Sequence, residues 1–396
     1  MRKRFCAMLL AVLMLLSLCA CGASSGPAAA GEPAKEEAAV EAAPTATPSP
    51  LEQLILKAEA GDTDAMVRLG DMYRDGDGVE ADWETAGSWY EKAGEAGDSN
   101  AYQWLGNMYY SASGDQKDYD KAFKAFSKAA DAGVADGMGM LGLLYGNGYG
   151  VEQDIAKSVQ WYEKAVDAGC LWASGPLANY YLYGRLESGK DEEKGIALLT
   201  SAAEAGYSSA YTGLGSYYHF QVKDYAKAEE YYLKAAEAGE VQAMTNLGSM
   251  YMYQVRDYDK AEEWLIKAVE AGDGASFTKV MLGDLFSGAA GSDKIDNEKA
   301  IEWFTKALEA DDPSAYSAFR LGVIYYQGQG VDADYEKAFE FFSRAVELWK
   351  EEDSLDVFYP QAVRTIGDMY ASGQGVEKDA EKAAEYYAWA DELASR

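Results

Sequence analysis

A short pattern that recurs along most of the chain limits its fold more than any other feature. A Leu-Gly pair, or a close variant of it, recurs nine times at intervals of 33 to 45 residues within the 396-residue sequence. Self-similarity at such a period is typical of repeat architectures, in which each unit packs on its neighbours. We number the segments as repeats one to nine and call the first residue of each pair the repeated leucine. These residues are Leu69, Leu105, Leu141, Leu177, Leu214, Leu247, Leu282, Leu321 and Ile366.

Each repeat predicts two antiparallel helices. Ala65, Leu69 and Tyr73 are four residues apart, so they share one face of a first helix. Gly70 would let a second helix approach that face closely. An Ala-Gly pair ends many units in the manner of a helix terminus, and no long segment alternates with period two. We therefore expect an all-α solenoid. Second helices are expected to start after capping aspartates such as Asp118, Asp224, Asp257 and Asp334.

An aromatic residue follows each repeated leucine after four positions. We expect this aromatic column to lie in the core, because a column of aromatic residues at helical spacing usually packs inside a repeat protein. Its members are Tyr73, Tyr109, Tyr145, Tyr181, Tyr218, Tyr251, Phe286, Tyr325 and Tyr370.

The units resemble Sel1-like repeats, which are relatives of tetratricopeptide repeats. Residues 65–97 read AMVRLGDMYRDGDGVEADWETAGSWYEKAGEAG, and a Gly-x-Gly-Val loop recurs at Gly76, Gly148, Gly328 and Gly373. The resemblance implies a right-handed α-solenoid of about nine helix-turn-helix repeats over residues 51–396. It also implies a role as an adaptor in membrane-associated assemblies.

Three departures from the repeat pattern stand out. Repeats five and six shorten the loop between their helices to QVKDY and QVRDY, and repeat four has Ala178 in place of the glycine. Repeat eight carries an insertion from Trp349 to Pro360, where a family-specific contact is expected to reside. Its conspicuous residues are Asp353, Asp356, Phe358 and Tyr359.

The N-terminal 50 residues differ in composition from the repeats. Three basic residues precede an apolar run, as in a secretory signal peptide, and LCACG around Cys21 resembles a bacterial lipobox. We expect a lipoprotein signal peptide over 1–20, a lipidated Cys21, and an Ala/Pro/Glu-rich linker over 21–50 that stays disordered. The protein would then be exported and lipid-anchored on the outer face of a bacterial membrane. An ordinary cleaved signal ending near Ala23 and an uncleaved anchor are the alternatives.

The charge and the residue inventory exclude several functions. With 66 acidic against 35 basic residues the net charge is −31, so nucleic acid is not an expected partner. A basic protein or peptide is the natural electrostatic complement. His219 is the single histidine, so the chain alone cannot supply a His-ligated metal site. We expect no cofactor, no metal, and membrane contact through the lipid anchor only.

Motifs that superficially suggest chemistry are better explained as structure. Gly146-x-Gly148-x-Gly150 belongs to the repeated loop after a helix, which is the wrong context for a dinucleotide site. Asp75-x-Asp77 lacks the further ligands of a Ca²⁺ loop. A pairing of Cys170 with His219 would be accidental. The sequence therefore predicts no catalytic residue.

What remains is the groove that first helices line in the related tetratricopeptide architecture. Positions five before, two after and five after the repeated leucine should face it. An asparagine two after can hydrogen-bond a peptide backbone, and Trp172, Phe277 and Tyr316 would be exposed aromatics of the kind that dominate interfaces. The predicted partner-binding residues are Asp64, Asp71, Arg74, Asn100, Asn107, Tyr110, Trp172, Asn179, Phe277, Tyr316, Tyr326 and Asp368.

Two functions of different classes follow. The first is a non-enzymatic, membrane-anchored scaffold that binds a protein or peptide through this groove. The alternative is a cell-wall-related hydrolase, or a regulator of a cell-envelope enzyme. Capture of a small solute is disfavoured, because such ligands usually occupy enclosed pockets.

Overall fold

The computed structural model describes residues 48–114, 117–186, 188–352, 354 and 356–395. The predicted signal peptide, the lipidated Cys21 and nearly all of the linker lie outside these residues, as does Asp353 of the insertion. Leu51 to Arg396 form one compact unit. Every regular element within the described residues is helical, so the predicted all-α solenoid is confirmed.

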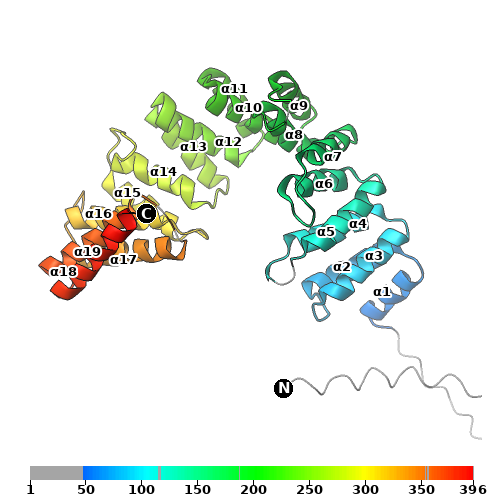
Figure 1. Cartoon of the computed structure of the whole chain (residues 1–396), viewed down its shortest axis with the longest axis horizontal. Coiled ribbons are helices and arrows are strands. Elements are labelled where there is room, and N and C mark those ends of the chain that lie inside the picture. The colour runs from blue at the N-terminus through cyan, green and yellow to red at the C-terminus, as the bar shows by residue number, and fades with distance from the viewer. Residues whose placement is uncertain (1–47, 115–116, 187, 353, 355, 396) are drawn as a thin grey trace, which may run out of the picture. The chain divides into compact units, whose positions relative to one another are not determined.

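Each repeat contains a first and a second helix that pack against each other, and successive helices lie side by side along the chain (Figure 1). The first helices are α2 (Thr63–Asp75), α4 (Ser99–Ser111), α6 (Ala135–Asn147), α8 (Ser174–Leu182), α10 (Ser209–Tyr217), α12 (Val241–Met250), α14 (Ser276–Ser287), α16 (Ala315–Gln327) and α18 (Tyr359–Ser372). The second helices are α3 (Trp83–Glu95), α5 (Tyr119–Asp131), α7 (Ile155–Asp167), α9 (Glu192–Glu204), α11 (Tyr225–Glu237), α13 (Tyr258–Glu270), α15 (Asn297–Leu308), α17 (Tyr335–Glu351) and α19 (Ala380–Ala394).

An extra helix, α1 (Pro50–Glu59), precedes the first repeat. Its Ala58 is fully buried in one cluster with Ala65, Met66 and Leu69 of α2. This helix therefore takes the place that the second helix of a preceding repeat would occupy, and it covers an apolar face that α2 would otherwise leave in water.

The glycine of the Leu-Gly pair makes room for an aromatic ring. A Cβ atom on Gly70 would lie 2.6 Å from Cε1 of Tyr90, so only glycine lets this ring rest on the backbone of α2. Repeat four solves the same problem differently. There the pair reads Leu177-Ala178, and the glycine stands on the facing second helix as Gly195, whose Cβ would lie 2.6 Å from Cγ of Leu182.

An aspartate joins the two helices of every repeat. It caps the second helix by accepting hydrogen bonds from backbone N–H groups of the first turn, as predicted for Asp118, Asp224, Asp257 and Asp334. Its own backbone N–H donates to the carbonyl oxygen of the aromatic column residue in the preceding first helix, over 2.8 to 3.2 Å in all nine repeats. We call this pair of interactions the aspartate clamp. It is the same whatever lies between the helices.

The aromatic column is less buried than expected. Tyr181, Tyr251 and Phe286 are buried, whereas the other six members are half-buried. From repeat two onward a lysine, three residues after the clamp aspartate, covers the ring. Its Nζ atom lies 4.3 to 5.3 Å from the ring centroid, as in Lys157 over Tyr145. The column is thus a seam sealed by cation–π contacts, each stabilising by about 0.5–1 kcal/mol.

Repeats five and six end their first helices in π-helical turns. These turns, η3 (Tyr218–Val222) and η4 (Tyr251–Val255), replace the glycine loop and explain the shorter spacing there. Each is terminated by a cationic residue in the left-handed conformation, Lys223 with φ 61° and Arg256 with φ 60°. In the described residues no other non-glycine residue has a positive φ.

The insertion of repeat eight folds inward. It lengthens α17, in which Trp349 is almost fully buried, and it places Phe358 against the ring of Phe319 with centroids 5.1 Å apart. Tyr359 is also buried. These aromatics stabilise the junction with α18, whereas Val357 of the same insertion is 81% exposed. The family-specific contact expected in this insertion stays a prediction.

First helices approach one another across repeats. α10 lies against both α8 and α12, and α14 lies against α16, whereas second helices of neighbouring repeats come less close in the described part of the chain. At these junctions the first helices lie closer together than the second helices do. Within the described residues none of the helices combines the length and apolar character needed to span a membrane.

Candidate functional site

The position two residues after the repeated leucine is partly or fully exposed in all nine repeats. Asn107, Asn179 and Asp368 are exposed there, and Asp71 is half-buried. Their side chains differ in whether the protein itself already uses them. That difference depends on the residue that the facing second helix presents.

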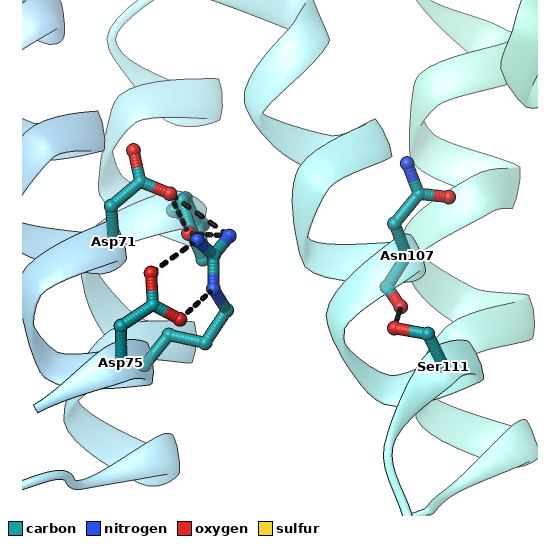
Figure 2. Close-up of polar contacts among 6 residues, drawn as sticks. Asp71, Asp75, Asn107 and Ser111 are labelled. Atoms are coloured by element: carbon teal, nitrogen blue, oxygen red, sulfur yellow. Dashed lines mark hydrogen bonds and ion pairs between the residues drawn. The ribbon is translucent and has the colours of Figure 1, made fainter. Parts of the chain in front are cut away.

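Figure 2 compares this position in repeats one and two. In repeat one the Tyr90 hydroxyl donates to Oδ1 of Asp71 over 2.7 Å, and the Arg74 guanidinium bridges Asp71 to Asp75. In repeat two the amide of Asn107 points away from Ser111, whose hydroxyl donates to the backbone carbonyl of Asn107 instead (Figure 2). In repeat one the side chain at this position is thus fully engaged by other residues of the chain, whereas in repeat two the amide of Asn107 is available.

The facing ring accounts for the contrast. Phe126 and Leu199 stand eight residues after the clamp aspartate, as Tyr90 does in repeat one, and neither carries a hydroxyl. In the described residues neither asparagine side chain makes a hydrogen bond. Repeat nine follows repeat one, because the Tyr387 hydroxyl donates to Asp368 over 2.8 Å and this hydrogen bond raises the pKa of the tyrosine. Two exposed amides, two repeats apart, are therefore available to a partner.

The position five before the repeated leucine is only partly exposed. Asp64, Asn100 and Phe277 face solvent, and Phe277 is among the most exposed large apolar side chains. Trp172 and Tyr316 are half-buried, contrary to the expectation that they would be exposed. Both reach back over the preceding repeat, so they act as ties between repeats.

Trp172 belongs to a polar tie centred on Asp136. The indole Nε1 donates to Oδ1 of Asp136 over 2.9 Å, the Cys170 thiol donates to the same oxygen over 3.2 Å, and Gln103 donates to Oδ2. Burial acts to raise the pKa of Asp136, but these hydrogen bonds outweigh it and lower the pKa. Burial and the neighbouring carboxylate raise the pKa of the Cys170 thiol to about 12. Cys170 therefore acts as a protonated donor to Asp136.

The position five after the repeated leucine turns toward the second helix. The Tyr110 ring packs at 5.8 Å from Tyr119, and Tyr326 packs at 5.5 Å from Tyr335, each partner being the first residue of the second helix. Arg74 is held by its two aspartates. These three side chains are therefore engaged by other residues of the chain, and their predicted role in binding a partner stays a prediction.

Repeats seven and eight share a half-buried polar cluster. The Tyr316 hydroxyl donates to Oδ1 of Asp284 over 3.1 Å, and Arg320 donates to the Ser287 hydroxyl over 3.0 Å. Burial raises the pKa of Asp284 to about 6, although Arg320 and the hydrogen bond from Tyr316 oppose the shift. The Arg320 Nε atom is buried without a hydrogen-bond partner among the described residues. Sequence reasoning missed Asp284, because carboxylates are abundant and only the fold shows which one is buried.

Cys170 and His219 do not form a pair. Cys170 contacts Asp136, whereas buried His219 lies 3.4 Å from the Tyr232 hydroxyl in repeat five, and burial lowers the pKa of its imidazole. Among the described residues no three acidic, histidine or cysteine side chains converge as a metal site would require. Asp75, once considered for a Ca²⁺ loop, is engaged by Arg74.

Comparison with known proteins gives a consistent family pattern. The model of the Sel1 repeat family matches nine segments, at residues 63–98, 99–134, 135–170, 177–207, 208–240, 241–273, 280–312, 315–348 and 361–388. No curated protein matches the chain significantly.

Several solved structures are similar to the chain. A protective antigen of uropathogenic Escherichia coli is 27% identical over 85% of this chain and 78% of its own, with a TM-score of 0.42. A Sel1 repeat protein of Oxalobacter formigenes is 30% identical over 56% of this chain and 99% of its own, with a TM-score of 0.44. An immunity protein of Pseudomonas aeruginosa is 21% identical over 54% and 82%, with a TM-score of 0.40.

Proposed function

Because the chain belongs to the Sel1 repeat family, we propose that it is a binding scaffold whose first helices hold an extended segment of a partner protein. The observation that carries this proposal is the pair of exposed, unsatisfied amides at Asn107 and Asn179, which stand at equivalent positions two repeats apart. An asparagine amide offers both a donor and an acceptor, the combination that a peptide backbone unit requires.

The charge of this surface favours a basic partner. Asp64 of repeat one is exposed and makes no ion pair within the described residues. Asp368 of repeat nine is also exposed. The whole chain carries a net charge of −31. A basic segment would associate faster at low ionic strength than at high ionic strength, because the attraction is screened by salt.

Anchoring to a membrane is the second part of the proposal. It is supported by the basic, apolar and small-residue segments that precede Cys21. Acyl chains on this cysteine would hold the repeats at a membrane surface. Replacement Cys21→Ser should move the protein from the membrane fraction to the soluble fraction. If the distribution and the mass of the mature N-terminus are unchanged, this part is incorrect.

In-cell photo-crosslinking tests the binding surface directly. A photoreactive benzoylphenylalanine is placed at position 107 or 179, and a matched control carries it at position 237, which is exposed on second helix α11. The two first-helix positions should capture the same partner and the control should not. The captured segment, synthesised as a peptide, should bind Asn107→Ala/Asn179→Ala at least about tenfold more weakly than the original protein. Equal capture at position 237 would contradict the proposal.

A further inference from the structure

The two π-turns bring large apolar side chains to the surface in matching register. Phe220 and Tyr253 stand six residues after the repeated leucine of repeats five and six, and Val222 and Val255 stand eight residues after it. Their exposed fractions are 56%, 45%, 48% and 46%, respectively. Scattered exposed apolar residues are ordinary, but a repeated pair at one edge of adjoining units is a patch.

The same edge is polar in most other repeats. At six residues after the repeated leucine the chain carries Asp75, Ser111, Asn147, Gln327 and Ser372. The connecting segments of those repeats thus begin with polar groups, as expected for surface turns. The apolar character of repeats five and six is therefore specific to the two π-turns and is not required by the repeat fold.

The two π-turns adjoin each other. α10 lies against α12, so the ends of these helices are neighbours. With its amide oriented to donate, Gln254 of η4 places its nitrogen 3.3 Å from Nε2 of His219 in η3. Phe220 in turn stacks on the His219 ring with centroids 4.0 Å apart. The buried imidazole therefore supports the exposed ring and ties it to the neighbouring turn.

Each apolar pair is followed by an unpaired cation. Lys223 and Arg256 are exposed and form no ion pair in the part of the chain that the structure describes. Both adopt the left-handed conformation, which costs a residue other than glycine about 1 kcal/mol. Glycine fills this helix-terminating role at Gly76, Gly148, Gly328 and Gly373. At both positions a cation therefore stands where glycine would be less strained.

Nearby carboxylates form no ion pair with these cations within the described residues. Asp224 and Asp257 follow them directly, but each carboxylate accepts a hydrogen bond from the backbone of its own second helix. The edge thus offers two apolar pairs and two exposed cations without an ion-pair contact in the described residues, on a chain whose net charge is −31. We name these six residues, Phe220, Val222, Lys223, Tyr253, Val255 and Arg256, the π-turn edge.

We propose that the π-turn edge is a second docking surface, for a peptide segment in which carboxylates stand beside large apolar side chains. Charge complementarity selects this occupant, because the partner's carboxylates would meet Lys223 and Arg256 while its apolar groups cover Phe220 and Tyr253. An anionic membrane is disfavoured, because its extended negative surface would face the strongly acidic rest of the chain, whereas a short segment brings a few carboxylates to the two cations alone. The proposal does not depend on the first-helix surface, whose expected partner is basic.

Fluorescence anisotropy with defined probes tests this edge on the full chain. One labelled 12-residue peptide repeats Leu-Glu-Phe-Glu, and a second repeats Leu-Lys-Phe-Lys. The acidic peptide should bind, and Phe220→Ser/Tyr253→Ser should weaken its binding at least about tenfold. Lys223→Gly/Arg256→Gly should also weaken it, and more so at low salt. Because glycine suits both left-handed positions, this second variant stays folded, so its loss of binding cannot come from unfolding.

Matched controls separate the outcomes. Gln327→Ser/Gln329→Ser changes the positions of repeat eight that correspond to Phe220 and Val222 in repeat five. This variant should leave binding of the acidic peptide unchanged. Binding of the basic peptide should be the same in all variants. The proposal is overturned if the acidic peptide does not bind, or if the repeat-eight control loses binding equally. It is also overturned if the original protein binds phosphatidylglycerol vesicles, or self-associates in sedimentation, and the edge variants lose that binding or self-association instead.

Discussion

The indole ring of Trp172 rests directly on the backbone of Gly139 in the preceding repeat. A Cβ atom on Gly139 would lie 2.5 Å from Cζ2 of Trp172, so this glycine exists to receive the ring. The indole N–H is bound to Asp136 on the same helix. Trp172 therefore holds repeats three and four together, and it could bind a partner only if it broke its contacts with Gly139 and Asp136.

Replacing Gly139 tests that relationship. Gly139→Ala should displace the indole and destabilise the protein by about 1–3 kcal/mol, because a rigid ring and a helix backbone must move apart. Gly175→Ala is a matched control, since a Cβ atom there meets nothing within 4 Å. It should be neutral or stabilising by up to about 1 kcal/mol. Denaturant unfolding monitored by tryptophan fluorescence measures both. Equal effects of the two changes would show that the ring does not depend on Gly139.

Asp284 should make stability fall as pH rises. Its pKa is about 6 in the folded protein, against 3.8 as its ordinary value, so the folded state binds the proton more tightly. The favourable contribution is complete below about pH 4 and is lost as pH rises through about 6. Asp284→Asn keeps an oxygen for the Tyr316 hydroxyl and removes the buried charge. The stability of this variant relative to the original should increase by about 1–3 kcal/mol between pH 4 and 7.

Thermal unfolding of both proteins across that pH range provides the measurement. Because other carboxylates titrate in both proteins, only the difference between them reports Asp284. A difference that is flat with pH would mean that Asp284 titrates like an exposed carboxyl group, and a difference of opposite sign would mean that Arg320 dominates its environment.

The left-handed cations should cost stability that glycine recovers. Lys223→Gly and Arg256→Gly should each stabilise the fold by up to about 1 kcal/mol, because φ near 60° is strained for every other residue except asparagine and aspartate. Lys223→Ala should be neutral or destabilising, which separates the backbone effect from loss of the charge. The midpoint of chemical denaturation of each variant, compared with that of the original protein, measures the effect. If alanine stabilises as much as glycine, charge repulsion is the cause instead.

The thiol of Cys170 should be inert in the folded protein. Burial and Asp136 raise its pKa to about 12, so very little thiolate is present at pH 8. In a chain with Cys6, Cys19 and Cys21 changed to serine, a disulfide reagent should react only as fast as the protein unfolds, and at once in denaturant. Fast reaction of the native protein would show an accessible thiolate, which would favour the hydrolase alternative.

The repeats made most of the fold predictable. Spacing of Leu69, Tyr73 and their equivalents implies two packed helices, and the capping aspartates mark where each second helix begins, because both depend on local periodicity and local hydrogen bonds. The role of Gly70 was predictable for the same reason. The fold of the insertion was not, since nothing local in residues 349–360 indicates that Phe358 turns inward to Phe319.

The candidate site was less predictable, because it depends on pairs of residues in different helices. Counting from the repeated leucine placed Asn107 and Asn179 on the surface, but it could not show that the Tyr90 hydroxyl donates a hydrogen bond to Asp71. The count also failed for Trp172 and Tyr316, which find partners one repeat away. The π-turn edge carried a usable signal, namely Phe220 and Tyr253 in one register, which emerges when the repeats are aligned on the leucine.

The aspartate clamp has a consequence for how such a chain can change over evolutionary time. The backbone bond from Asp334 to Tyr325 spans a glycine loop, and the bond from Asp257 to Tyr251 spans a π-turn three residues shorter, with the same geometry. Deletions and insertions between those two anchor points therefore leave the register of both helices intact. The sequence of each connecting segment can therefore vary, and with it the chemistry of the surface, without a change in the packing of the apolar interior.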